Sequence, residues 1–323
     1  MKIAVLDDYA DAFRTAPAFA RLSEHEVTVF RDTEKEPEAL IARLAGMEAL
    51  VLTQQRSPLP AAVIERLPRL RFIMETGRHT GHIAIDACTR QGVVVSTGGA
   101  GGPDATAELT WGLILAALRH IPEEARRLRE GQWQAIAGTG LKGRTLGIYA
   151  YGRIGAMVAR VGAAFGMRVL CWGREGSLQR ARDDGYEVAA NREALFAESD
   201  VLSLHIVLND ATRGIVTAAD LARMKPGALL VNTSRAPIIA PGALLAALEA
   251  GRPGRAAVDV FDDEPVLGAS DPLIGLPNIL CTPHLGYATR GVFDALYEVA
   301  VDRLLAFAAG APVDVANPGA AKG

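Results

Sequence analysis

Three side chains able to bind anions or exchange protons follow predicted strands in the second half of the chain: Arg235, Glu264 and His284. A guanidinium holds a carboxylate through two parallel hydrogen bonds, an imidazole exchanges a proton near neutral pH, and a neighbouring carboxylate orients that imidazole. Together these groups are suited to hydride chemistry. Taken one at a time, each has a simpler explanation as a solvated or structural residue. Their joint position after strands, where ligands gather in open α/β sheets, favours the chemical interpretation.

A glycine-containing turn precedes these residues. The apolar run 146–150 is typical of a buried parallel strand, and Gly152 and Gly155 follow it at two positions of the G-x-G-x-x-G pattern. Glycines there let the backbone approach a pyrophosphate, which then lies against the first N–H groups of a helix. The first glycine of the pattern is replaced by Ala150, for which we expect a negative φ. The turn predicts a dinucleotide site.

The elements around these residues alternate between strand and helix. Strands separated by helical patterns of about ten residues predict parallel, doubly wound sheets. The loop 97–103 contains four glycines and a proline, which makes it the best linker candidate. We expect Asp104 to cap a long helix over 105–120, and Thr217 with Asp220 to form a capping box.

Composition limits the classes of protein to consider. With 323 residues the chain is long enough for two domains, and a net charge of −3 with 50% hydrophobic residues indicates a globular protein without a nucleic-acid surface. The three cysteines, Cys88, Cys171 and Cys281, suggest neither disulfides nor a metal site, so a reducing cytoplasm fits best. The longest apolar stretch, 109–118, is too short to cross a membrane, and we expect no membrane span.

Several ordered motifs resemble those of the D-2-hydroxyacid dehydrogenase family, the group that includes phosphoglycerate, glycerate and formate dehydrogenases. The resemblance extends over nearly the whole chain. Besides the glycine turn, it rests on the segments SDVLSLH (199–205), MKPGALLVNTSR (224–235), DVF leading to EP (259–265) and TPH (282–284).

The resemblance implies an α/β fold with two doubly wound domains. A Rossmann cofactor domain, residues 99–290, would be inserted into a flavodoxin-like substrate domain made of residues 1–98 and 291–323. The active-site cleft would lie between the two domains.

The resemblance also implies roles for individual residues. Arg235 would hold the substrate carboxylate and the C2 oxygen, His284 would be the acid/base, and Glu264 would pair with it. Asp259 would face the nicotinamide carboxamide, and His205 would lie near the adenine or be structural. The expected cofactor-binding residues are Gly152, Arg153, Ile154, Gly155, Gly173, Arg174, His205, Thr233, Ser234, Asp259 and Gly286.

In that family the loop at 76–82 gives backbone N–H groups to the substrate carboxylate. Here the loop also contains Arg78 and His79, which could hold a second acidic group of the substrate or could simply be solvated. After Arg235 the chain has Ala236 where the family commonly has glycine, and Val207 replaces a usual proline.

The position that selects the cofactor is unusual. An acid at the end of the second strand of this domain would bind the ribose 2′-hydroxyl of NAD, but Gly173 stands there and Arg174 follows. A cation in this loop could hold the 2′-phosphate of NADP, whereas Glu175 could still reach the ribose. We therefore lean slightly to NADP over NAD, the more frequent cofactor of the family.

We expect an enzyme that transfers a hydride between a nicotinamide cofactor and C2 of a D-2-hydroxy acid or 2-oxo acid. The alternative is an NAD(H)-sensing interaction protein like the corepressors that resemble this family and retain the same three residues. A homodimer through the cofactor domain is expected, with the helix 109–118 and Trp111 buried against a partner; burial in the chain's own core is a near-equal alternative.

Overall fold

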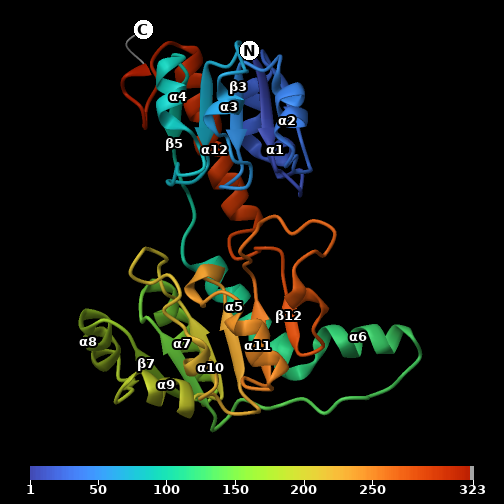
Figure 1. The fold of residues 1–323 in the computed structure, drawn as a ribbon, viewed down its shortest axis with the longest axis vertical. Coiled ribbons are helices and arrows are strands. Elements are labelled where there is room, and N and C mark those ends of the chain that lie inside the picture. Colours follow the sequence, from blue (N-terminus) through green and yellow to red (C-terminus); the bar gives the residue numbers. More distant parts are fainter. Residues whose placement is uncertain (321–323) are drawn as a thin grey trace. The chain divides into compact units, whose positions relative to one another are not determined.

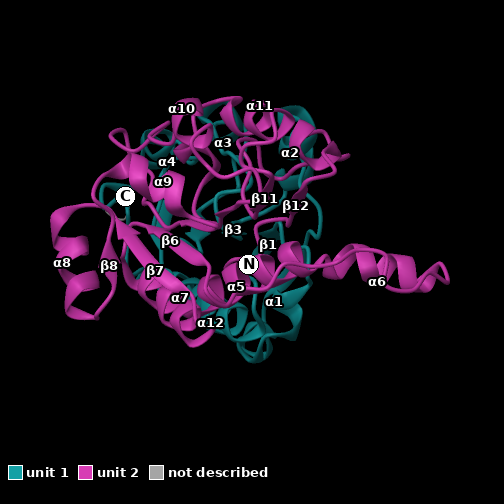
Figure 2. Ribbon diagram, turned by 90° about the horizontal axis from the view of Figure 1, so that it is seen from below, with its two compact units in different colours: residues 1–102, 288–323 teal, residues 103–287 magenta. Residues whose placement is uncertain are grey.

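The computed structural model describes residues 1–320; residues 321–323, which belong to the predicted discontinuous domain, lie outside this described part. The chain divides into two compact units, which we call unit 1 (1–102 with 288–323) and unit 2 (103–287) (Figure 1, Figure 2). The borders expected from the sequence differ from these by four residues (102 against 98) and three residues (290 against 287). The glycine-rich loop begins as part of unit 1, because Gly98 donates its N–H to the carbonyls of Glu75 and Gly77.

The sheet of unit 1 has five parallel strands in the order β2-β1-β3-β4-β5. This 2-1-3-4-5 order is that of flavodoxin-like folds. The central strand β3 is Ala-Leu-Val-Leu and is buried along its whole length, as expected where helices cover both faces of a parallel sheet. The strands are β1 (Lys2–Leu6), β2 (Glu26–Val29), β3 (Ala49–Leu52), β4 (Phe72–Glu75) and β5 (Val94–Thr97).

The last helix of the chain, α12, packs into the core of unit 1. Its Tyr297 is fully buried and meets the Phe13 ring edge-on at 4.9 Å between centroids. The hydrophobic core of unit 1 therefore contains residues of the first 102 positions together with residues of the C-terminal segment. The helices of unit 1 are α1 (Ala12–Thr15), the 3-10 helix η1 (Pro17–Leu22), α2 (Pro37–Leu44), α3 (Ala61–Ile64), α4 (Ile85–Arg90) and α12 (Arg290–Ala308).

The sheet of unit 2 has seven parallel strands in the order β12-β11-β10-β9-β6-β7-β8. Counted from β6, this is the 3-2-1-4-5-6 order of a Rossmann fold with one more strand beside the sixth. The predicted fold class is confirmed. The strands are β6 (Thr145–Tyr149), β7 (Arg168–Trp172), β8 (Glu187–Val188), β9 (Val201–Leu204), β10 (Leu229–Asn232), β11 (Arg255–Val258) and β12 (Ile279–Cys281).

Of the two helix N-caps predicted in unit 2, the structure confirms one and contradicts the other. The capping box is confirmed: Thr217 and Asp220 exchange side-chain and backbone hydrogen bonds. The cap at Asp104 is wrong, because Pro103 already has helical backbone angles and the helix begins at Asp104 itself. The helices are α5 (Asp104–Arg119), α6 (Ile121–Arg129), α7 (Arg153–Ala164), α8 (Glu175–Asp183), α9 (Arg192–Glu198), α10 (Ala218–Leu221), η2 (Ala236–Ile238), α11 (Ala243–Glu249) and η3 (Pro272–Gly275).

The apolar helix α5 is buried within unit 2. Trp111 is 6% exposed and its indole N–H donates to the carbonyl of Val158 at 3.2 Å. Of the two alternatives for this helix, Trp111 follows burial in the chain's own core, because α7 covers its ring. None of the helices within residues 1–320 combines the length and apolarity that a bilayer crossing requires.

Candidate active site

His284 and Glu264 meet in unit 2 although they follow different strands. Nδ1 of His284 lies 2.6 Å from Oε2 of Glu264, and the two side chains are 21% and 20% exposed. Oε1 of Glu264 accepts the N–H of Phe261 at 2.9 Å, which holds the carboxylate in place. Because Nδ1 faces this carboxylate, Nε2 is the ring nitrogen able to exchange a proton with a substrate.

Asp259 shapes the loop that carries His284. It is fully buried; Oδ1 accepts the Thr282 hydroxyl at 2.6 Å and the Leu285 N–H at 2.7 Å, and Oδ2 accepts the Gly286 N–H at 2.8 Å. His284 has a left-handed φ of 54°, which these bonds help to hold. Burial raises the pKa of Asp259, while the hydrogen bonds oppose the rise. The described contacts of Asp259 thus support the His284 loop, and its contact with nicotinamide stays a prediction.

Arg235 is exposed after β10. Its Nη1 donates to the Ser234 carbonyl at 2.7 Å, and within residues 1–320 the guanidinium forms no ion pair. The Asn232 side chain donates to the carbonyl of Arg235 at 3.0 Å and accepts the N–H of Ser234 at 3.0 Å, which braces the backbone below the guanidinium. His284 and Glu264 therefore touch, whereas Arg235 is a separate, available cation in the same unit.

The turn after β6 leads directly into α7. Gly152 precedes the first helical residue, and a Cβ at Gly152 would meet no atom within 4 Å. The first turn of α7 has no side-chain cap, so its N–H groups are available to an anion. At Gly155 a Cβ would lie 2.6 Å from the Ala150 carbonyl, so only glycine allows the helix to approach β6. These features fit a dinucleotide pyrophosphate.

The expectation of a negative φ at Ala150 is wrong. Its φ is 75°, the conformation that a glycine would adopt there. The Ala150 N–H donates to the Trp172 carbonyl at 2.7 Å and its carbonyl accepts the Gly152 N–H at 2.9 Å. The first bond ties the turn to β7 and the second lies within the turn, so the turn keeps this geometry and Ala150 has a strained backbone conformation.

We expect Ala150→Gly to raise the free energy of unfolding by about 0.5 kcal/mol, because a left-handed alanine costs about 1–2 kcal/mol and the extra freedom of unfolded glycine about 0.4–1 kcal/mol. Denaturant titration measures the change. The matched control is Ala163→Gly, at an exposed position of α7, which should lower stability by about 1 kcal/mol. Equal losses in both variants would contradict the strain at Ala150.

The loop after β7 faces the glycine turn. A Cβ at Gly173 would lie 3.3 Å from Cα of Ala150 and 3.4 Å from Oγ of Ser177. That hydroxyl is buried and makes no hydrogen bond within the described residues. Arg174 is exposed and forms no ion pair in the same range, whereas Glu175 pairs with Arg182 at 2.7 Å. The loop presents a cation and an unused hydroxyl, and its only acid is engaged.

The other predicted cofactor residues use polar groups within unit 2. Burial lowers the pKa of His205 to about 4, so this imidazole is neutral at neutral pH, as a structural residue would be. The contacts are His205 Nε2 with Ser203 Oγ (2.9 Å), Thr233 Oγ1 with Thr110 Oγ1 (2.9 Å), the Ser234 hydroxyl donating to the Leu204 carbonyl (2.8 Å), and the Thr106 hydroxyl donating to the Gly286 carbonyl (2.8 Å).

Two supporting residues, Asn232 and Thr282, were not singled out by the sequence analysis. Asn232 braces the Arg235 turn, and Thr282 binds the Asp259 carboxylate. A polar residue that ends an apolar strand run, two or three positions before a site residue, is the signal that could have identified them. The predicted substrate residues Arg78 and His79 lie in unit 1, where both side chains are exposed in the loop after β4.

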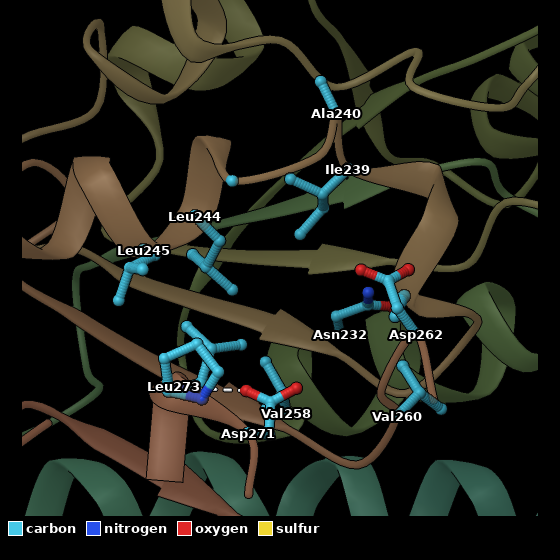
Figure 3. A pocket seen from close by; sticks show the side chains of 13 residues that line it. Asn232, Ile239, Ala240, Leu244, Leu245, Val258, Val260, Asp262, Asp271 and Leu273 are labelled. Carbon is cyan, nitrogen blue, oxygen red and sulfur yellow. Dashed lines mark hydrogen bonds between the residues drawn. The ribbon is translucent and has the colours of Figure 1, made fainter. Parts of the chain in front are cut away.

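A cavity of about 210 Å³ lies at the carboxyl ends of β10 and β11 (Figure 3). Its walls are largely apolar, with Ile239, Leu244 and Val260 among them, and Asn232 lies on one wall. The cavity is smaller than a dinucleotide requires, and Arg235, Glu264 and His284 do not line it.

Comparisons with known proteins agree with this geometry. A family model described as D-isomer specific 2-hydroxyacid dehydrogenase, NAD binding domain, matches residues 111–286. The glyoxylate reductase of Aeropyrum pernix is 36% identical over 296 residues, which cover 88% of each chain. The hydroxypyruvate reductase of Blautia hydrogenotrophica is 29% identical and covers 98% of this chain and 100% of its own.

A solved structure gives the same result over both units. The crystal structure of phosphoglycerate oxidoreductase from Vibrio cholerae O395 has a TM-score of 0.91 and 47% sequence identity, and the match covers 96% of this chain and 100% of that one. The region matched by the family model includes the glycine turn, Arg235, Glu264 and His284. The chain belongs to the D-isomer specific 2-hydroxyacid dehydrogenase family.

Proposed function

We propose that this oxidoreductase transfers a hydride between a nicotinamide cofactor and C2 of a small 2-oxo or D-2-hydroxy acid, with His284 as acid/base and Arg235 as the substrate anchor. The 2.6 Å contact between His284 Nδ1 and Glu264 Oε2 carries the assignment, because it leaves Nε2 for the substrate. The open glycine turn before α7 supports a dinucleotide in the same unit.

The bound nicotinamide supplies or accepts the hydride. In the reductive direction, protonated His284 donates the Nε2 proton to the C2 oxygen as negative charge develops on it. Arg235 holds the substrate carboxylate through its two parallel donors and stabilises the charge on the same oxygen. Glu264 keeps the imidazole in orientation through Nδ1. In the oxidative direction the neutral imidazole accepts the hydroxyl proton.

The substrate class extends to acids with a second anionic group. Arg78 and His79 are exposed donors in the unit 1 loop, and they would bind this group while the loop backbone binds the carboxylate. The similar protein from Vibrio cholerae is named a phosphoglycerate oxidoreductase, and the phosphate of phosphoglycerate is such a second anion. The alternative, a nucleotide sensor without turnover, is not favoured, because the relatives are named as reductases.

A substrate panel tests the proposal. Glyoxylate, pyruvate, hydroxypyruvate, phosphohydroxypyruvate and oxaloacetate are each assayed with NADH and NADPH, and oxidation of the cofactor is recorded. We expect turnover with at least one acid and the highest kcat/KM with an acid that has two anionic groups. Tight cofactor binding without turnover of any of them would favour the sensor.

We further propose that the loop after β7 accepts NADP. Arg174 is a cation without an ion-pair partner in residues 1–320, and the nearby Ser177 hydroxyl is unused. A 2′-phosphate would satisfy both. Position 173, where NAD enzymes of this fold have an acid, is glycine.

We expect Arg174→Gln to raise KM for NADPH about tenfold and to leave KM for NADH within about twofold, because only the 2′-phosphate needs the charge. Initial rates with both cofactors measure the difference. Arg223→Gln, which removes an exposed arginine elsewhere in unit 2, is the control. Equal kcat/KM for NADH and NADPH in the unmodified enzyme would show that this loop does not discriminate.

For the oligomeric state we propose a homodimer formed through α6 and the residues after it. Figure 2 shows α6 extending away from the rest of unit 2. None of its residues is buried, and Ile121, Leu128 and Trp133 are 53%, 58% and 77% exposed. An arm with this much exposed apolar surface is typical of an interface. A second copy related by a twofold axis would cover it.

We expect Leu128→Ser with Trp133→Ser to convert the dimer to monomer at micromolar concentration, because both apolar anchors of the arm are lost. Sedimentation velocity measures the state. The control is Val207→Ser, which removes an apolar side chain that is 78% exposed elsewhere in unit 2. A dimer that persists in the arm variant would contradict this interface.

The cysteines support a cytoplasmic location. Cys88, Cys171 and Cys281 are free thiols, and burial raises the pKa of Cys88 and Cys281 to about 11 and that of Cys171 to about 12. Thiols held protonated in this way are unreactive side chains, as expected in a reducing compartment.

A further inference from the structure

Unit 1 contains a buried carboxylate that the proposed chemistry does not use. Glu75 ends β4 and is fully buried. Its Oε1 accepts the Gly77 N–H at 2.6 Å, while Oε2 has no hydrogen-bond partner within the described residues. Burial of a carboxylate is costly unless a charged or hydrogen-bonding group compensates for it. The position of Glu75 therefore calls for a specific partner.

That partner is His82. Its Nε2 lies 3.2 Å from Oε2 of Glu75, and the side chains are 9% and 0% exposed. Both ring nitrogens are buried and make no hydrogen bond in residues 1–320, so the contact between the imidazole and the Glu75 carboxylate is an electrostatic one. Glu75 precedes segment 76–81 and His82 follows it, so their contact holds the two ends of the segment close together.

Hydrogen bonds hold the same segment at both ends, one to strand β3 and one to Leu59 in a neighbouring loop. The Thr76 hydroxyl donates to the Leu52 carbonyl at 2.9 Å, and the Leu59 N–H donates to the His82 carbonyl at 2.8 Å. Between these ties, the backbone N–H groups of residues 78–81 find no acceptor among the described residues. The two ends of the loop are therefore held in place, while the backbone N–H groups of residues 78–81 remain available to a ligand.

Gly77 packs closely against the Glu75 carboxylate. A Cβ at that position would lie 2.7 Å from Oε1 of Glu75 and 2.9 Å from Nε2 of Gln55. Any larger residue would require one of these two side chains to move. The carboxylate thus holds both ends of the loop, one through Gly77 and one through His82.

We propose that Glu75 and His82 are positioning residues that fix loop 76–81 in the conformation that binds the substrate carboxylate. The inference rests on the proposed function, in which this loop and Arg78 contact the substrate. The pair acts through the loop and touches neither substrate nor cofactor. Its removal affects binding of the 2-oxo acid and not the hydride step at saturation.

The test compares Glu75→Gln, Glu75→Ala, His82→Gln and the double variant Glu75→Ala/His82→Gln. We expect Glu75→Ala and His82→Gln each to raise KM for the best 2-oxo acid about tenfold, with kcat and the cofactor KM within about twofold of the unmodified enzyme. Glu75→Gln should fall between the unmodified enzyme and Glu75→Ala, because an amide oxygen still accepts the Gly77 N–H. The double variant should be no worse than its worse single parent, because the two changes remove one shared contact.

A second measurement does not depend on activity. Amide exchange of Gly77, Leu59 and Ile83, whose N–H groups report the two ends of the loop, should become about tenfold faster in the Glu75 and His82 variants. Asp220→Asn is the matched control: it alters a buried carboxylate paired with Arg192 in unit 2 and should change neither KM nor these amides.

The outcomes separate the two proposals. Folded Glu75→Ala and His82→Gln variants with unchanged KM and unchanged loop exchange would overturn the positioning role. If exchange became faster but the enzyme turned over no 2-oxo acid, Glu75 and His82 would still be shown to fix the loop, and the proposed function would be overturned. A loss confined to kcat would also contradict the positioning role, because it would point to direct participation in the chemistry.

Discussion

Replacing His284 by alanine lowers kcat for the 2-oxo acid at least about 100-fold, if its imidazole donates the proton to the developing alkoxide. The expectation follows from geometry: Nδ1 is 2.6 Å from the Glu264 carboxylate, which leaves Nε2 directed to a substrate. No other imidazole of unit 2 contacts a carboxylate in the described residues, so nothing nearby replaces the lost proton donor. Steady-state kinetics at saturating substrate measures the effect.

Two controls identify the loss as chemical. The Kd for NADPH, measured by fluorescence titration, should stay within about twofold in His284→Ala, because the glycine turn is unchanged. Glu264→Gln should lower kcat by about tenfold, since the amide still accepts from Nδ1 but no longer compensates the imidazolium charge. A His284→Ala variant with a kcat near that of the unmodified enzyme would remove this residue from the mechanism.

The second large effect is expected at Arg235. Arg235→Gln should lower kcat/KM for the 2-oxo acid roughly 100-fold or more, because loss of a charge that pairs with a desolvated carboxylate costs about 3 kcal/mol. The guanidinium forms no ion pair in residues 1–320, so the substitution breaks no internal pair. Arg235→Lys should recover only part of the activity, since an ammonium cannot bind a carboxylate through two parallel donors.

The matched control for Arg235 is Arg223→Gln, which removes another exposed arginine of unit 2. It should leave kcat/KM unchanged. Thermal melting of both variants should agree with that of the unmodified enzyme, because neither arginine is buried. A normal kcat/KM in Arg235→Gln, or an equal loss in Arg223→Gln, would show that the guanidinium at 235 does not anchor the substrate.

Much of the fold was predictable from the sequence because its signals are local. The apolar runs, the helical patterns between them and the glycine spacing at 152 and 155 depend on neighbouring residues, and they indicated two parallel sheets correctly. The capping box at Thr217 was also predictable, since it joins residues three positions apart. The short elements α1, η1 and α4 were not, because a helix of four to six residues has no readable period.

Where contacts between distant segments decide the outcome, the sequence was insufficient. Ala150 takes a left-handed φ because the turn is bonded to Trp172 on β7, and the preference of alanine alone predicts the opposite. Trp111 is covered by α7 of its own unit, although its apolar helix could equally have faced a partner. Asp104 lies inside its helix because Pro103 already has helical angles.

The candidate site shows the same division. Residue types and their places after strands were enough to select Arg235, Glu264 and His284, since the carboxyl ends of parallel strands lie on one edge of a sheet. Only the tertiary structure brings Nδ1 of His284 to the Glu264 carboxylate across 20 positions of chain, and only it pairs Glu75 with His82 under the unit 1 loop. The reason is physical: side-chain chemistry is a property of each residue, whereas distance, burial and backbone strain exist only once remote segments are packed together.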